Sequence, residues 1–186
     1  TMMIETGAGK GSGFSDAAYQ AAGALIVPTA EAVWAQCDMI IKVKEPLPDE
    51  YPYLREGQIV YTYLHLAANK PLTEAMIQSG CIGVAYETIE DKGGGLPLLK
   101  PMSEIAGRLS IQEGAKYLEK PFGGKGVLLG GVPGVKNAKV IILGAGIVGT
   151  NACKMAVGLG ADVTVMDIDL DKLRALDAHY GNRIHT

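Results

Sequence analysis

Short apolar segments rich in valine and isoleucine alternate along the chain with segments whose apolar residues recur at helical spacing. The apolar segments predict strands at 2–5, 38–44, 58–64, 81–86, 138–143, 162–166 and 183–186. The helical spacing predicts helices at 71–78, 103–118, 150–158 and 170–180. Because strands that alternate with helices pair in parallel, the pattern predicts an α/β fold.

Glycine and proline interrupt this pattern at two places. The stretch 91–97, Asp-Lys-Gly-Gly-Gly-Leu-Pro, predicts a linker between a first unit, 1–97, and a second unit, 98–186. The proline-rich stretch 45–52 cannot continue a sheet, so we expect a loop that leaves the end of a strand. Ser103 is expected to cap the helix that follows the linker.

The second unit contains a glycine motif directly after a predicted strand and at the start of a predicted helix. The motif is Gly144-Ala-Gly146-Ile147-Val148-Gly149, which matches G-x-G-x-x-G. The first glycine permits a tight turn, the second lets the backbone approach a pyrophosphate, and the third lets the helix pack closely on the strand. The helix N-terminus then directs its N–H groups at the phosphates.

An acidic residue follows at the position that such a site requires. Asp167 ends the next predicted strand, close to the spacing of about 20 residues at which an acid binds the adenosine ribose. A carboxylate there accepts hydrogen bonds from the ribose hydroxyls and repels a 2′-phosphate, so NAD is preferred over NADP. Lys172 is nearby, but one lysine does not make a phosphate pocket. The alternative for the motif is a tight turn that only needs small residues. The glycine-rich stretch 7–13 does not match a P-loop and is expected to be a loop.

Composition excludes several classes of partner. The formal charge of −3 argues against nucleic acid or an anionic membrane as the main partner. No segment approaches the roughly 18 consecutive apolar residues of a membrane span. Cys37, Cys81 and Cys153 are odd in number and widely spaced, which favours reduced thiols in the cytoplasm over disulfides or a metal site.

Two residues of the first unit are candidates for chemistry, because each is predicted at the carboxyl end of a strand. Lys44 is suited to hold a carboxylate or to polarise a carbonyl. His65 titrates near neutrality and is suited to transfer a proton. The alternatives are a solvated strand end for Lys44 and a hydrogen-bonded imidazole for His65. Tyr86 and Glu87 end another strand, where such residues are more often structural.

Several longer motifs resemble the alanine dehydrogenase and transhydrogenase α-subunit family, and alanine dehydrogenase in particular. They occur in order along essentially the whole chain, at 42–46 (KVKEP), 62–68 (TYLHLAA), 85–88 (AYET), 101–108 (PMSEIAGR), 124–134 (GKGVLLGGVPG) and 163–167 (VTVMD). The resemblance implies that the second unit is the first half of a Rossmann-type, doubly wound NAD-binding domain. It also implies that the first unit is part of the substrate domain.

The implied reaction is the reversible, NAD-dependent oxidative deamination of L-alanine to pyruvate and ammonium. Carried over residue by residue, Lys44 binds the substrate and His65 is the general acid and base. Ser103 contacts the cofactor, Ile147 and Val148 lie at the pyrophosphate turn, and Asp167 and Lys172 lie at the ribose.

The resemblance also implies that family members begin earlier, with a substrate-binding arginine, and continue to a catalytic aspartate and a final helix. We therefore expect this chain to be a fragment that is inactive alone, whereas full-length members form hexamers. Two other functions stay open. One is the dinucleotide-binding domain of a proton-translocating transhydrogenase, and the other is a non-catalytic NAD-binding fragment.

Overall fold

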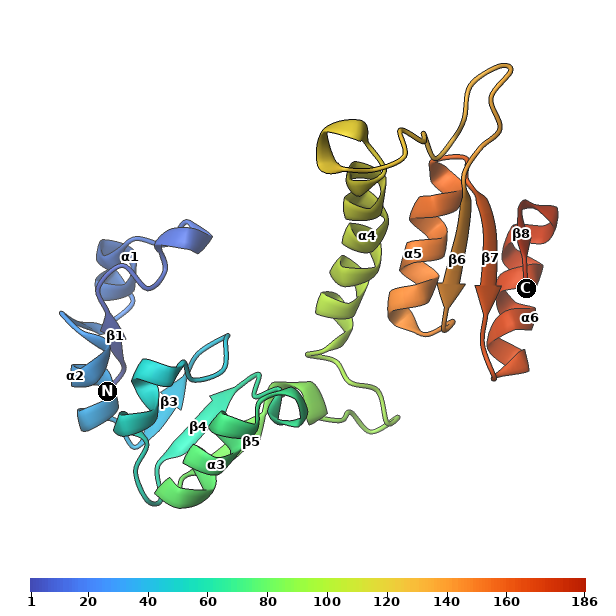
Figure 1. Ribbon diagram of the computed structural model, residues 1–186. Coiled ribbons are helices and arrows are strands. Elements are labelled where there is room, and N and C mark those ends of the chain that lie inside the picture. Colours follow the sequence, from blue (N-terminus) through green and yellow to red (C-terminus); the bar gives the residue numbers. More distant parts are fainter. The chain divides into compact units, whose positions relative to one another are not determined.

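Parallel strand pairs form all three sheets of the protein in a computed structural model that describes residues 1–186 (Figure 1). This confirms the predicted α/β class. The chain divides into two compact units, Thr1–Leu96 and Pro97–Thr186. Each unit has a separate hydrophobic core. None of the α-helices has the length and apolar character of a membrane span.

The first unit contains two sheets. Its small sheet pairs β1 (Met3–Glu5) with β2 (Leu25–Val27). Its larger sheet has the order β3-β4-β5, with strands at Met39–Ile41, Ile59–Thr62 and Ile82–Ala85. Three helices connect the strands, α1 (Asp16–Ala21), α2 (Ala30–Gln36) and α3 (Lys70–Ser79).

The core of the first unit lies between the larger sheet and the helices α2 and α3. Trp34 of α2, Val60 of β4 and Leu72 of α3 are almost completely buried in it. Side chains that accept backbone N–H groups begin both helices, with Thr29 before α2 and Asn69 before α3. These caps satisfy helix N–H groups that have no partner within the helix.

The second unit has one sheet of order β6-β7-β8, with strands at Lys139–Leu143, Asp162–Met166 and Ile184–His185. Helix α5 (Ile147–Gly158) connects β6 to β7, and α6 (Leu170–Tyr180) leads towards β8. The long helix α4 (Lys100–Tyr117) precedes the sheet and lies beside α5 (Figure 1). The sheet therefore orders its strands as they occur in sequence, with the βαβ connections of a dinucleotide-binding unit.

Alternate positions along the strands of this sheet have opposite environments. Val163 and Val165 are buried against α5 and α6 in the core. Ile141 and Leu143 of β6 point to the opposite face and are 67% and 80% exposed. The helices of the second unit therefore cover one face of the sheet.

A close backbone contact joins α4 to α5. A Cβ atom built on Gly107 of α4 would lie 2.2 Å from the carbonyl oxygen of Val148 in α5. Arg108 on the next position of α4 donates a hydrogen bond from Nε to Oδ1 of Asn151 at 3.1 Å. Glycine at position 107 thus allows the two helices to pack more closely than any residue with a Cβ atom would permit.

Three predicted boundaries are wrong. Ser103 is not the cap of α4, which begins three residues earlier, and its N–H donates within the helix to the carbonyl of Leu99. Lys44 and His65 do not end their strands, because β3 ends at Ile41 and β4 at Thr62. Pro101 explains the earlier start of α4, since proline is favoured in the first turn of a helix.

Candidate functional site

The glycine turn of the second unit, residues 144–149, has a conformation that requires glycine at two of its three glycine positions. Gly144 has a φ of 101°, in the left-handed region that favours glycine. A Cβ atom on Gly149 would lie 1.8 Å from the carbonyl oxygen of Gly144, so no larger residue fits without a shift of the backbone. Gly146 is the N-cap residue directly before α5 and has open space at its Cβ position. The turn is therefore tight on its inner side and open on its outer side.

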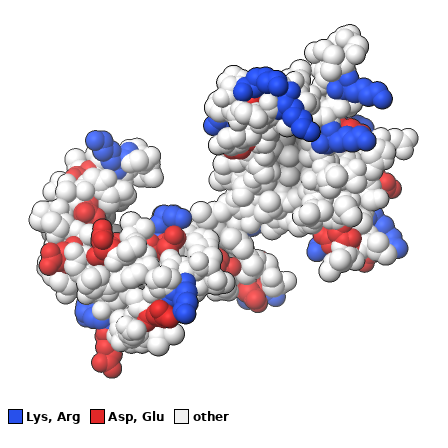
Figure 2. All heavy atoms as spheres, viewed as in Figure 1, with Lys and Arg blue, Asp and Glu red and all other residues white.

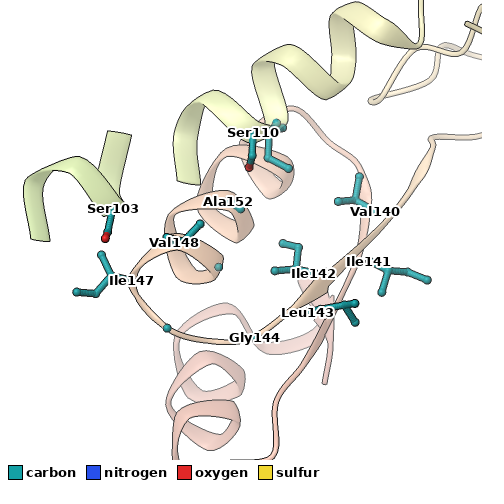
Figure 3. A pocket seen from close by; sticks show the side chains of 13 residues that line it. Ser103, Ser110, Val140, Ile141, Ile142, Leu143, Gly144, Ile147, Val148 and Ala152 are labelled. Atoms are coloured by element: carbon teal, nitrogen blue, oxygen red, sulfur yellow. The ribbon is translucent and has the colours of Figure 1, made fainter. Parts of the chain in front are cut away.

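The N-terminus of α5 lies at a hollow of about 630 Å³ in the second unit. The lining residues come from the first half of α4, from β6 and from the glycine turn, and include Ser103, Ile147 and Val148. Figure 3 shows the Ser103 hydroxyl directed towards the first turn of α5, where Ile147 lies. No side chain caps α5, and no charged side chain lines the hollow. Backbone N–H groups, the helix dipole and the serine hydroxyls that line the hollow are therefore the groups available to bind an anion here.

Asp167 lies just after β7 and is connected to the glycine turn. One carboxylate oxygen accepts the N–H of Ala145 at 2.5 Å, and the other accepts the N–H of Asp169 at 2.8 Å. These two backbone N–H groups, helped by the charge of Lys172, hold the pKa of Asp167 below its usual range despite partial desolvation. The carboxylate is thus ionised and fixed beside the turn.

Lys172 lies in the first turn of α6 and not at the hollow that Ser103 lines. Its ammonium is 3.3 Å from a carboxylate oxygen of Asp169. Together with Ala145 and Lys154 it lines a second hollow of about 410 Å³ between α5 and α6. Lys172 and Asp167 therefore both lie near Ala145 of the glycine turn.

In the first unit, Lys44 lies three residues beyond β3 and its ammonium is 3.4 Å from Oε2 of Glu45. The backbone at Val43 and Lys44 is hydrogen-bonded to the side chain of Thr62 in β4, which is completely buried. The Thr62 hydroxyl lies 2.8 Å from the carbonyl oxygen of Lys44 and 3.0 Å from that of Val43. This contact fixes the segment that carries Lys44 against the neighbouring strand.

His65 lies three residues beyond β4, in a turn before α3. It is the only residue other than glycine with a positive φ, at 49°. Its ring stacks on that of Tyr63, with centroids 6.3 Å apart and an interplanar angle of 18°. Glu87, just after β5, accepts the backbone N–H of His65 at 2.7 Å.

Glu45 shows that Lys44 and His65 belong to the same neighbourhood of the first unit. Its own backbone N–H lowers the pKa of the Glu45 carboxyl against the effect of burial, and the charges of Lys44 and His65 lower it further. The carboxyl ends of adjacent parallel strands meet at one edge of a sheet, which explains why these residues meet. A lysine, an imidazole and a carboxylate at one edge can bind a carboxylate group and transfer a proton.

Three residues that support these sites were not predicted to do so from the sequence. Glu45 was placed in a loop, Glu87 was regarded as structural, and Gly107 was treated as part of an ordinary helix. The only available signal for the two glutamates was their position after predicted strands. Gly107 gave no signal, because the close approach of α4 and α5 cannot be recognised from one sequence.

The distribution of charge agrees with an anion site that uses backbone groups. In the second unit, Lys and Arg side chains gather at the end that carries the C-terminus of α4 and the following loop (Figure 2). The glycine turn lies at the opposite end of the sheet, where β6 ends (Figure 1). On the face drawn in Figure 2, the largest group of basic side chains therefore lies away from the turn, whereas Lys154 and Lys172 line the second hollow together with Ala145.

Comparison with known proteins gives matches over the whole chain. Residues 1–106 match the model "Alanine dehydrogenase/PNT, N-terminal domain", and residues 110–186 match "Alanine dehydrogenase/PNT, C-terminal domain". The chain is 56% identical over 185 residues to alanine dehydrogenase of Bacillus subtilis and covers 48% of that protein. It is 57% identical over 185 residues to alanine dehydrogenase of Methanococcus maripaludis and covers 50% of it. The chain thus spans about half the length of the curated relatives it matches.

Solved structures agree with these matches. A structure of L-alanine dehydrogenase is 55% identical and superimposes with a TM-score of 0.84, over 100% of this chain and 51% of the other. A transhydrogenase structure from Sinorhizobium meliloti is 26% identical, with a TM-score of 0.71 over 95% of this chain and 50% of the other. The glycine turn, the acid that follows it and these matches together show that the chain belongs to the alanine dehydrogenase/PNT family.

Proposed function

We propose that this chain carries the NAD-binding turn and part of the substrate site of an NAD-dependent alanine dehydrogenase. The observation that carries the dinucleotide part is the turn itself, where Gly149 packs on the Gly144 carbonyl and Asp167 is hydrogen-bonded to Ala145. The identity of about 55% to proteins named alanine dehydrogenase supports the choice of alanine as substrate.

The residues around the turn fit a dinucleotide. The uncapped N-terminus of α5, including Ile147 and Val148, would hold the pyrophosphate beside Gly144 and Gly146. Asp167 would accept hydrogen bonds from the ribose hydroxyls, since each carboxylate oxygen has a lone pair beyond the one that its N–H partner uses. Its negative charge disfavours a 2′-phosphate, which supports NAD over NADP. Ser103 would contact the cofactor from the hollow at the N-terminus of α5, and Lys172 would contact it from the hollow between α5 and α6.

The bound NAD would supply a hydride acceptor for the Cα–H of alanine. Lys44 would bind the substrate carboxylate or carbonyl. His65 would take the proton of the water that adds to the imine, and would return a proton to the nitrogen when the C–N bond of the carbinolamine breaks. The products of this sequence are pyruvate, ammonium, NADH and one proton. Lys44 and His65 would thus contribute substrate binding and proton transfer from the first unit.

The first experiment measures binding and turnover separately. We expect the 186-residue chain to bind NAD in calorimetry and to reduce it with L-alanine only slowly, because the relatives that bear this name are twice as long. A full-length protein that carries these residues should form NADH with L-alanine at alkaline pH.

A glycine substitution tests the cofactor site. Gly149→Ala should abolish NAD binding, because the new methyl group meets the Gly144 carbonyl. Gly158→Ala in the same helix is the control, since its Cβ position is open, and it should bind NAD normally. Equal NAD binding by both variants would contradict the proposed cofactor site.

The transhydrogenase relative supports a second candidate, the dinucleotide-binding domain of a transhydrogenase. The two candidates differ in their substrate. Hydride exchange between NADH and an NADP analogue without alanine would favour the transhydrogenase. Alanine-dependent NADH formation would favour the dehydrogenase, and the much higher identity to alanine dehydrogenases supports that outcome.

A further inference from the structure

His65 has a backbone conformation that its own side chain disfavours. Its φ of 49° and ψ of 35° lie in the left-handed region, where residues other than glycine are uncommon. Such a conformation is strained and persists only where the surrounding structure determines it. The turn at His65 therefore needs contacts that hold it in place.

Glu87 provides these contacts from the neighbouring strand. Its Oε1 accepts the N–H of His65 at 2.7 Å and the N–H of Leu64 at 3.0 Å, and its Oε2 lies 3.2 Å from the same Leu64 nitrogen. Leu64 is 3% exposed, so its side chain is anchored in the core while its N–H faces the carboxylate. One carboxylate thus binds two successive N–H groups at the point where the chain turns.

The charge of Glu87 is maintained by this arrangement. Burial would raise the pKa of the Glu87 carboxyl, but the N–H groups of His65, of Glu87 itself and of Leu64 together hold the pKa below its usual range. The hydrogen bonds are therefore charge-assisted, which makes them about twice as strong as neutral ones.

We propose that Glu87 is a positioning residue for His65, an inference that rests on the proposed function of His65. The carboxylate acts through the main chain, because its oxygens are occupied by backbone N–H groups. It fixes the left-handed turn, and the turn fixes where the imidazole leaves the backbone. In this orientation the imidazole stacks on the ring of Tyr63. Glu87 thus sets the direction from which His65 reaches the substrate.

A positioning role and a merely structural role predict different kinetics. Misplacing an acid–base group by about 1 Å costs on the order of 100-fold in rate. It leaves ground-state binding of substrate largely unchanged, so the loss is in kcat and not in KM. A merely structural glutamate would lower the amount of folded enzyme and leave the kcat of the folded fraction intact.

Kinetics of Glu87→Gln in a full-length protein carrying these residues give the first test. Glutamine keeps the size and one acceptor oxygen but removes the charge. We expect kcat for L-alanine to fall at least about tenfold per folded active site, with KM within about twofold. Glu90→Gln, which removes the same charge from an exposed position three residues on, should keep both constants. Unchanged kcat in Glu87→Gln, or a rise in KM alone, would overturn the proposal.

The second test does not depend on activity and uses the 186-residue chain. Glu87→Gln should lower the urea midpoint less in a His65→Gly background than in the parent, because glycine adopts the left-handed conformation without help. The amide proton signals of Leu64 and His65 should also move upfield in Glu87→Gln. Equal destabilisation in both backgrounds would overturn the proposal even if alanine were turned over. If this coupling is found but the full-length protein does not oxidise alanine, the proposed function fails and the contact between Glu87 and His65 stands.

Discussion

Single carboxylates next to strand ends organise both candidate sites. Asp167 accepts a hydrogen bond from the N–H of Ala145 in the glycine turn, and Glu87 accepts one from the N–H of His65 in the turn before α3. In each case an acid that follows one strand fixes the backbone that follows the adjacent strand. The sequence predicted that these acids follow strands. It did not predict which backbone N–H groups donate hydrogen bonds to them.

The acid dependence of stability tests the role of Asp167. Its pKa is lowered in the folded protein, so its contribution to stability is complete above the ordinary value of 3.8 and is lost as the pH falls through the folded value. Asp167→Asn should therefore lower the urea midpoint at pH 7, and this difference from the parent should shrink below about pH 4. The measurement is urea unfolding followed by circular dichroism at a series of pH values.

Asp177→Asn is the matched control, because it removes a carboxylate from an exposed position on α6. It should leave the pH dependence of the parent intact. An Asp167→Asn variant whose midpoint differs from the parent equally at pH 7 and pH 3 would show that the ionised carboxylate does not stabilise the turn.

At the scale of elements, the sequence predicted the helices and strands well where local signals are strong. The bounds of β7 and α6 were predicted residue for residue, since alternating valines mark the strand and helical spacing marks the helix. The strands near Lys44 and His65 were predicted too long, because Val43 after β3 and Tyr63 and Leu64 after β4 continue the apolar pattern beyond the last paired residues. The left-handed turn at His65 could not be predicted, because only the tertiary contact with Glu87 makes it stable.

The contact between α4 and α5 gives a prediction about element packing. Gly107→Ala should destabilise the protein by about 1–3 kcal/mol, because the added methyl group overlaps the Val148 carbonyl and forces the helices apart. Gly114→Ala in the same helix has open space and should stabilise it by about 0.5–1 kcal/mol. Both values follow from urea unfolding at neutral pH. Stabilisation by both substitutions would show that the helices pack less closely than described.

At the scale of the whole molecule, the two units have cores that share no residue. The single tryptophan, Trp34, is 3% exposed and lies in the core of the first unit. Its fluorescence therefore reports on the first unit, whereas the proposed cofactor site lies entirely in the second. One chain thus carries a natural probe on one unit and a ligand site on the other.

Ligand linkage makes this separation measurable. NAD at about 100 times its dissociation constant should stabilise the second unit by about 2.7 kcal/mol. The circular dichroism transition should then split or broaden towards higher urea, while the Trp34 fluorescence transition stays where it is. An equal shift of the Trp34 transition would show that the two units unfold together. The Gly149→Ala variant should show no shift in either signal.

The order of strands in the sheets has a consequence for synthesis on the ribosome. Every strand pairs with the strand before it or after it in sequence, in β1-β2, in β3-β4-β5 and in β6-β7-β8. Within each sheet, every strand after the first is therefore translated after the neighbour with which it pairs. None of these pairings has to wait for a segment that is made much later, and chains fold N-terminal units first during synthesis. The sheets can thus grow one strand at a time, in the direction of translation.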